Sequence, residues 1–432
     1  MVKRLFLDTT PLRESREFRL LYIGQMVSFF GRQLTVVAIP VQVYAITESS
    51  LMIGLVSFAQ LIPLIVFSLV GGAIADAFDR RKLLLIMQLV LAATSVGLAI
   101  NAMSDEPAVW PLFVFSAAAA GLSGIDSPTR SASIPSLVRR ELLPSAYALN
   151  QTLMQVGQVA GPAAAGLIIA RVSLAATYWL DAATFAIAFA TVFAMAPLVP
   201  EGGGTRPGFA SVAEGVRFLK SRRILQSTFL IDLNAMIFGM PRALFPALAA
   251  TTFAGSFGLE NEAVAGLLFA APGAGALLGA LTTGWVSSVR RHGRAVLIAV
   301  AAWGAAIAGF GLTDSLPLAL ALLALAGAAD VVSAVFRNTM LQIRVPDRLR
   351  GRLSAIHIAV VTGGPRLGDL EAGAVAAATS PAVSVVSGGL ACIAGVGLLA
   401  LTVPQFSRAT RDPAEDEEDV DDVDPEPVAT AV

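Results

Sequence analysis

Long stretches without any charged residue constrain the fold of this chain more than any other feature. Charged residues make up only 14% of the sequence, against about 25% in water-soluble proteins. Each stretch is long enough to cross a hydrocarbon core of about 30 Å as a helix. They are Ser49 to Ala75, Leu83 to Ser104, Leu142 to Ala170, Ala263 to Val289 and Ala372 to Ser407. The sequence therefore predicts an all-α integral membrane protein.

An internal repeat divides the chain into two similar halves. Arg130, Val138, Leu142, Ala148, Gly157, Gly161 and Gly166 recur 207 positions later as Arg337, Val345, Leu349, Ala355, Gly364, Gly368 and Gly373. An offset close to half the chain length predicts two bundles related by pseudo-two-fold symmetry. In a membrane, such bundles typically enclose a substrate path between them.

Hydropathy predicts twelve transmembrane helices, six in each bundle. They are expected at 17–46, 50–76, 83–104, 108–130, 142–171, 175–197, 223–254, 262–289, 295–313, 316–338, 349–378 and 381–403. The bundles are accordingly expected at 17–199 and 223–403. A short arm at 1–16 precedes them, a linker with an amphipathic helix at 200–222 joins them, and an acidic tail at 404–432 follows.

The distribution of charge predicts the orientation in the membrane. With the N-terminus in the cytoplasm, every lysine and arginine lies on the cytoplasmic side except Arg32, Arg171, Arg242 and Arg366, as the positive-inside rule requires. Both termini are then cytoplasmic. Ten acids and no base lie between Asp412 and Glu426, which predicts a disordered tail.

The loop after the second predicted helix reads Gly-Gly-Ala-Ile-Ala-Asp-Ala-Phe-Asp-Arg-Arg-Lys over 71–82. It resembles the loop signature of the major facilitator superfamily, although Ala77 and Asp79 replace the usual arginine and glycine. The resemblance implies that Gly72 admits a neighbouring helix and that Asp76 pairs with basic groups to hold a gate shut. Arg80 and Arg81 are the basic candidates. A plain positive-inside anchor is the simpler interpretation of the basic cluster.

The fifth predicted helix contains Gly157, Gly161, Pro162 and Gly166. Small residues at this spacing allow close helix packing, and the proline can kink the helix. The pattern resembles the antiporter motif of superfamily exporters, with Leu167 replacing a final glycine. Helix packing alone is the competing interpretation; the Gly-Pro dipeptide favours export.

Shorter strings narrow the resemblance. They are Val37 to Gln42, Arg242 to Leu248, Thr339 to Gln342, Pro346-Asp347 and Gly351-Arg352. These resemble the enterobactin (siderophore) exporter branch of the superfamily and related multidrug efflux proteins, from about residue 16 to 403. The resemblance implies proton-driven export of a siderophore-like or drug-like molecule across a bacterial cytoplasmic membrane.

Polar residues inside the predicted helices suggest a substrate cavity. Gln25, Ser28, Arg32, Thr35 and Gln42 are spaced so that one face of the first helix would carry them toward the cavity. Arg32 and Arg242, with forked and permanently charged side chains, suit an anionic or catechol-bearing ligand. The substrate-cavity candidates are therefore Gln25, Arg32, Gln42 and Arg242.

Acidic residues inside the helices are candidates for proton coupling, because burial favours the neutral form of a carboxyl group. Asp232 is the first choice, Asp369 the second and Glu371 a weaker one. Structural ion pairs are the competing explanation. Two further pairs are predicted as gate ion pairs: Asp126 with Arg130, and Asp330 with Arg337.

The sequence offers little for other classes of function. It has one cysteine, Cys392, no metal-ligand spacing around its two histidines and no phosphate-binding loop. We therefore expect a monomeric transporter, not an enzyme, with no cofactor and no nucleic-acid partner; its partners are a small-molecule substrate, protons and lipid. The alternatives are multidrug efflux by proton antiport, nutrient import by symport, and a non-transporting receptor or scaffold that works through the acidic tail.

Overall fold

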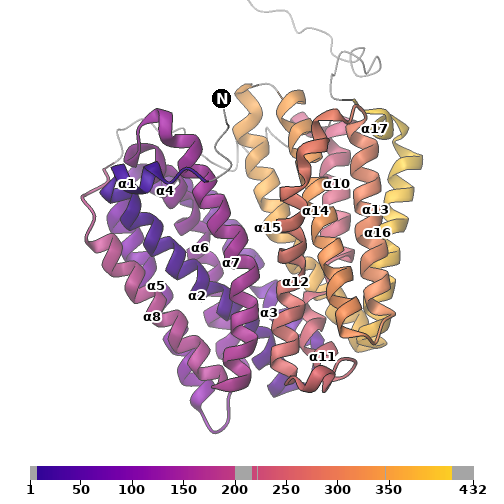
Figure 1. Ribbon diagram of the computed structural model, residues 1–432, viewed down its shortest axis with the longest axis horizontal. Helices are drawn as coiled ribbons and strands as arrows, with labels where there is room; N and C mark the ends of the chain where they lie inside the picture. Colours follow the sequence, from indigo (N-terminus) through magenta and orange to yellow (C-terminus); the bar gives the residue numbers. More distant parts are fainter. Residues whose placement is uncertain (1–6, 200–216, 221, 346, 411–432) are drawn as a thin grey trace, which may run out of the picture.

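The computed structural model describes residues 7–199, 217–220, 222–345 and 347–410 (Figure 1). Most of the expected linker and nearly all of the expected acidic tail lie outside these residues. The described part is helical, and its long helices form two groups that stand side by side.

The first bundle contains six membrane-crossing segments. They are α2 (Arg16–Thr47), α3 (Ser50–Ala59) continued by α4 (Leu61–Ala77), α5 (Arg80–Met103), α6 (Trp110–Leu137), α7 (Leu143–Arg171) and α8 (Leu174–Phe193). Short side chains set several helix starts. Ser15 accepts a hydrogen bond from the Phe18 N–H, and Asp79 accepts one from the Arg81 N–H, so each satisfies a free donor in a first turn.

The second bundle repeats this arrangement. Its segments are α10 (Arg223–Phe238) with α11 (Phe245–Ala250), α12 (Asn261–Leu281), α13 (His292–Gly311), α14 (Leu316–Arg344), α15 (Asp347–Ala378) and α16 (Pro381–Thr402). Short helices α1 (Thr10–Glu14) and α17 (Pro404–Arg408) flank the two bundles. Ten of the segments are long and apolar enough by composition to cross a membrane, and α6 and α15 complete the twelve.

Several predicted helices differ from the structure: the one at 50–76 is divided into α3 and α4, those at 108–130 and 316–338 continue to Leu137 and Arg344, and two others change more. The expected helix at 223–254 is interrupted between Phe238 and Phe245, where Arg242–Leu244 form a 3-10 turn. Pro241 cannot donate a backbone hydrogen bond there. The Ala243 N–H donates to Asp369, and the Gly239 carbonyl accepts a hydrogen bond of 2.9 Å from the Trp303 indole. The expected helix at 262–289 ends at Leu281, and a 3-10 segment, Thr283–Ser288, follows.

The repeated glycines occupy equivalent places in the two bundles. A Cβ at Gly161 would overlap the Gln33 Cβ on α2, and a Cβ at Gly368 would overlap the Met236 carbonyl oxygen on α10. Each glycine therefore lets the fifth helix of a bundle pack against the first helix of the same bundle. The structure thus confirms that the sequence repeat is a structural repeat.

The last glycine of each repeat faces the opposite bundle. A Cβ at Gly166 would lie 2.8 Å from Gly266 Cα on α12, and a Cβ at Gly373 would lie 2.6 Å from the Ser50 carbonyl oxygen on α3. These close approaches lie near the end of the molecule opposite the N-terminus. Toward the N-terminal end the two bundles draw apart (Figure 1).

Candidate functional site

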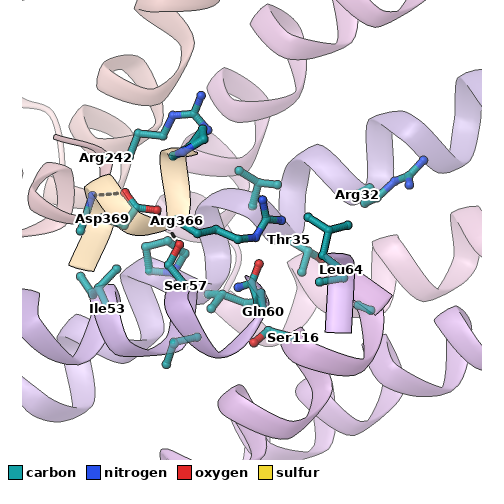
Figure 2. A pocket seen from close by; sticks show the side chains of 18 of the residues that line it. Arg32, Thr35, Ile53, Ser57, Gln60, Leu64, Ser116, Arg242, Arg366 and Asp369 are labelled. Atoms are coloured by element: carbon teal, nitrogen blue, oxygen red, sulfur yellow. Dashed lines mark hydrogen bonds between the residues drawn. The ribbon is translucent and has the colours of Figure 1, made fainter. Parts of the chain in front are cut away.

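A cavity of about 240 Å³ lies between the bundles (Figure 2). Its walls come from α2, α3, α4 and α6 on one side, and from the Arg242–Leu244 turn, α12 and α15 on the other. Its polar lining residues are Arg32, Thr35, Ser57, Gln60, Ser116, Ser123, Arg242, Arg366 and Asp369. Three guanidinium groups and one carboxylate therefore meet in one space.

The arginines of this cavity keep unused hydrogen-bond donors. Arg32 donates from Nη1 to Ser123 Oγ at 3.4 Å and stacks over the Phe29 ring, but its buried Nε has no partner. Arg366 donates to the Thr362 carbonyl of its own helix at 2.5 Å, and its Nε also has no partner. An unpartnered buried donor costs free energy, so both groups can donate a further hydrogen bond to a ligand oxygen.

Asp369 joins the two bundles. Ser57 on α3 donates a hydrogen bond of 2.6 Å to Asp369 Oδ2, and the Ala243 N–H donates one of 3.2 Å to Oδ1. The carboxylate therefore holds together α3, α15 and the turn that carries Arg242. Its expected role in proton coupling stays a prediction, although its side chain does line the cavity.

A second cavity, of about 350 Å³, shares Val36, Arg242 and Phe269 with the first. Its lining is richer in aromatic side chains and includes Phe29, Phe245 and Trp303. Together the two cavities fall in the range of about 300–1,000 Å³ typical of small-molecule sites. Arg242, whose side chain is exposed, stands where they meet.

Two of the four predicted cavity residues line neither of these two cavities, and their role in a substrate path stays a prediction. Gln25 donates from Nε2 to Asn150 Oδ1 on α7 at 2.7 Å, and Gln42 accepts from the Tyr178 hydroxyl on α8 at 2.8 Å. Both side chains are buried, and neither lines either cavity. A helix advances about 100° per residue, so 17 residues end about 100° away from their starting direction. The polar residues of α2 therefore contact several helices in turn.

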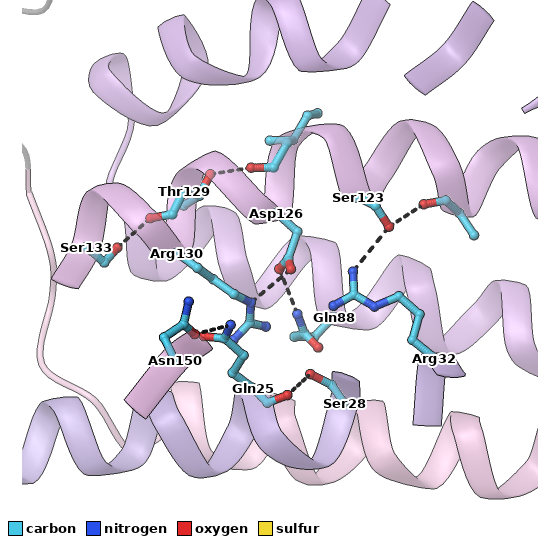
Figure 3. Close-up of polar contacts among 12 residues, drawn as sticks. Gln25, Ser28, Arg32, Gln88, Ser123, Asp126, Thr129, Arg130, Ser133 and Asn150 are labelled. Atoms are coloured by element: carbon cyan, nitrogen blue, oxygen red, sulfur yellow. Dashed lines mark hydrogen bonds and ion pairs between the residues drawn. The ribbon is translucent and has the colours of Figure 1, made fainter. Parts of the chain in front are cut away.

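The pair predicted on the fourth helix is present and buried (Figure 3). Arg130 Nε lies 2.9 Å from Asp126 Oδ2, and Gln88 donates from Nε2 to Asp126 Oδ1 at 3.0 Å. Both Nη atoms of Arg130 have no hydrogen-bond partner. The pair lies within the first bundle, and its gating role stays a prediction.

The equivalent arginine of the second bundle has two acidic neighbours. Arg337 Nη1 lies 2.6 Å from Asp232 Oδ1 on α10, and Arg337 Nη2 lies 3.8 Å from Asp330 Oδ1 on its own helix. The predicted pair with Asp330 is therefore present but is the longer contact. Asp232 is paired inside its bundle and does not line the two cavities.

The loop motif forms contacts inside the first bundle. Arg80 pairs with Asp76 at 3.3 Å and donates to the Ala132 carbonyl at 2.7 Å, while Arg81 donates to the Phe193 carbonyl at 2.6 Å. The close helix approach expected at Gly72 is seen at the adjacent residue Gly71, where a Cβ would lie 2.6 Å from the Gly124 carbonyl oxygen.

Asp181 on α8 is a buried acid that the sequence-based prediction missed. Thr35 and Ser95 both donate to its Oδ2, at 2.7 and 2.8 Å, and its buried Oδ1 has no partner. A lone acid inside a predicted apolar helix was the available signal. The spacing of residues along one helix does not show which other helices pack against it, so the sequence does not reveal the partners of Asp181 on α2 and α5.

Within the described residues, twelve membrane-crossing segments form two pseudo-symmetric bundles around a central cavity that contains charged groups, and with the family match below they define a major facilitator transporter, which is not an enzyme. The sequence profile of the transmembrane secretion effector family matches residues 8–429, and the chain belongs to that family.

Individual proteins resemble this chain along most of its length. It is 28% identical over 407 residues to the enterobactin exporters EntS of Shigella boydii and Escherichia coli, covering 94% of this chain and 96% of each relative. Its fold resembles a nucleoside transporter, NupG, with a TM-score of 0.75 at 13% identity, covering 90% of this chain and 99% of that structure. It also resembles a bacterial homologue of the lysosomal transporter Spinster, with a TM-score of 0.67 at 14% identity, covering 93% and 97%.

Proposed function

We propose that this protein exports an amphipathic, siderophore-like molecule across the cytoplasmic membrane in exchange for protons. The observation that carries the proposal is the cavity between the bundles. There Arg32 of the first bundle and Arg366 of the second both retain an unpartnered buried Nε. A ligand that binds both guanidinium groups would contact the two bundles at once.

The orientation of the protein in the membrane is inferred from its loops. The ends of the helices that carry Arg80, Arg81, Arg139 and Arg140 belong in the cytoplasm by the positive-inside rule. The close contacts of Gly166 and Gly373 then lie at the outer end of the molecule. The described conformation is accordingly inward-facing, the state in which an exporter takes up its substrate.

The chemistry of the cavities favours an anionic substrate with aromatic parts. Guanidinium groups can bind carboxylate or catecholate oxygens through paired donors. The second cavity offers Phe245, Phe269 and Trp303 to an aromatic ring. The relatives named as enterobactin exporters are consistent with this class. A cationic drug, the rival substrate, would meet three arginines and one acid in the first cavity.

Asp369 and Asp232 are proposed to take part in proton coupling through the charge that each contributes. Asp369 lines the cavity that also contains Arg242 and Arg366, so gaining or losing a proton there changes the charge that a bound substrate meets. Asp232 balances the charge of Arg337 deeper in the second bundle. The gates are proposed to include Asp76, Arg80 and the buried pair Asp126–Arg130.

Two measurements with iron-free enterobactin as the probe test the proposal: its binding to the purified protein, and its transport by that protein in proteoliposomes. Arg32→Gln and Arg366→Gln should each weaken binding about 10- to 100-fold, because a hydrogen bond to a charged group contributes about 1.5–3 kcal/mol. Arg171→Gln, an exposed arginine at the outer end of α7, is the matched control and should bind normally. Unchanged binding in both cavity variants would exclude this site, and flux indifferent to a pH gradient would exclude proton coupling.

A further inference from the structure

Two buried arginines hold equivalent places in the repeat but have different numbers of acidic neighbours. Arg130 is paired with Asp126 alone, whereas Arg337 has Asp232 at 2.6 Å and Asp330 at 3.8 Å. Continued along the helix, the repeat register aligns Asp330 with Ser123. The second bundle therefore holds one acid more than its arginine needs for charge balance.

The two acids beside Arg337 differ in exposure. The Asp232 side chain is 1% exposed and makes the short ionic contact, so removing its charge would leave a buried arginine unpaired. The Asp330 side chain is 32% exposed and lines the second cavity. A proton can reach Asp330 from the cavity, and binding it leaves the shorter ion pair intact.

The surroundings of Asp330 contain few other charges. Among the described residues, the charged groups that act on it are Arg337 on its own helix, Asp232 on α10 and Arg242 on the 3-10 turn. The helices α12 and α13 that pack against α14 are uncharged over 263–281 and 295–311, and their titratable or charged residues, Glu262, His292 and Arg294, lie in the first turn of each helix. Asp330 therefore shares one arginine with a competing acid.

Resting on the proton-coupled export proposed above, we infer that Asp330, in addition to Asp369, exchanges protons with the substrate cavity, while Asp232 stays ionised beside Arg337. Asp330 and Arg242 line the same cavity. A proton on Asp330 removes a negative charge from that cavity, and its departure restores the charge. An anionic ligand near Arg242 and an ionised Asp330 therefore disfavour each other, so occupancy of the ligand site and the protonation state of Asp330 are linked.

Infrared difference spectra of purified protein taken across a pH change test the assignment without a substrate. The carboxylic-acid absorption that appears on acidification should lose one component in Asp330→Asn and regain it in Asp330→Glu. Asp126→Asn, which alters the equivalent pair of the first bundle, is the matched control and should keep that component. A spectrum of Asp330→Asn identical to that of the unaltered protein would overturn the inference.

Transport separates a failure of this inference from a failure of the proposed function. In proteoliposomes with iron-free enterobactin, Asp330→Asn should retain exchange of labelled for unlabelled probe but lose at least tenfold of the acceleration caused by a pH gradient. If the unaltered protein responds to the gradient and Asp330→Asn responds equally, Asp330 is not a carrier. If the unaltered protein does not respond, the proposed proton antiport itself is wrong.

Discussion

Ser57 on α3 donates a hydrogen bond of 2.6 Å to Asp369 on α15, and this bond joins the two bundles. It lies beside the cavity that the bundles share. Nearby, a Cβ at Gly54 would lie 2.5 Å from the Asp369 carbonyl oxygen, so backbone and side chain both meet there. Any conformational change that opens the cavity by moving α3 away from α15 must break this bond.

Removing the Ser57 hydroxyl should therefore favour opening of the bundles at this end. A hydrogen bond to a charged group contributes about 1.5–3 kcal/mol, so Ser57→Ala should shift the equilibrium away from the described conformation by about tenfold or more. Distances between spin labels at Ser104 and Leu312, with the buried Cys392 replaced, would report the shift.

Ser116→Ala is the control for that experiment, because Ser116 lines the same cavity but bonds only to the Phe113 carbonyl of its own helix. It should leave the label distances unchanged. Equal distances in both variants would show that the Ser57–Asp369 bond does not hold the bundles together.

Gly166 should be intolerant of a side chain in this conformation. An added Cβ would lie 2.6 Å from the Glu262 carbonyl oxygen and 2.8 Å from Gly266 Cα, and backbone atoms cannot move aside cheaply. Overpacking costs about 1–3 kcal/mol, so Gly166→Ala should depopulate the described state about 5- to 150-fold. The same spin-label distances measure it. Gly397→Ala, with nothing within 4 Å of its Cβ, should have no effect.

The buried Asp126–Arg130 pair should matter for stability. Removing one partner of a buried ion pair typically costs about 3–5 kcal/mol, because it leaves a charge unpaired. Asp126→Ala should therefore lower the unfolding temperature in detergent markedly. Glu14→Ala, which breaks the exposed contact with Arg139, should change it little, since exposed pairs contribute at most about 1 kcal/mol. A similar loss in both variants would contradict this interpretation.

Asp181 should affect substrate binding by holding α2 in position. Its Oδ2 accepts from Thr35, which lines the cavity one turn after Arg32, and from Ser95 on α5. Asp181→Ala leaves two hydroxyls without their acceptor, and binding of iron-free enterobactin should weaken several-fold. Asp181→Asn keeps an acceptor oxygen and should restore most of it. If both variants lose binding equally, charge and not hydrogen bonding is what Asp181 supplies.

The sequence could predict the parts of this protein that depend on local composition. Uncharged stretches locate the helices, although the C-terminal ends of α6, α12 and α14 differ from those expected, and the repeat by itself pairs Gly166 with Gly373. The pair Asp126–Arg130 was also predictable, because residues four apart share one face of a helix. The interruption at Arg242 was not, because the Trp303 indole that caps it comes from another helix.

The partners of buried polar groups were decided by the tertiary structure alone. From the sequence, the Gln42 side chain could line a cavity or contact another helix. It accepts a hydrogen bond from Tyr178 because α8 packs beside it. Likewise, Asp232 has no partner within its own helix and pairs with Arg337, about 100 residues later. The sequence by itself determined that the chain is a helical membrane protein, because backbone groups in lipid must pair within a helix. Its internal repeat also determined that two similar bundles form. Which ionic groups face the cavity depended on helix rotation and on contacts between bundles, and these are set by many small packing interactions that no single segment contains.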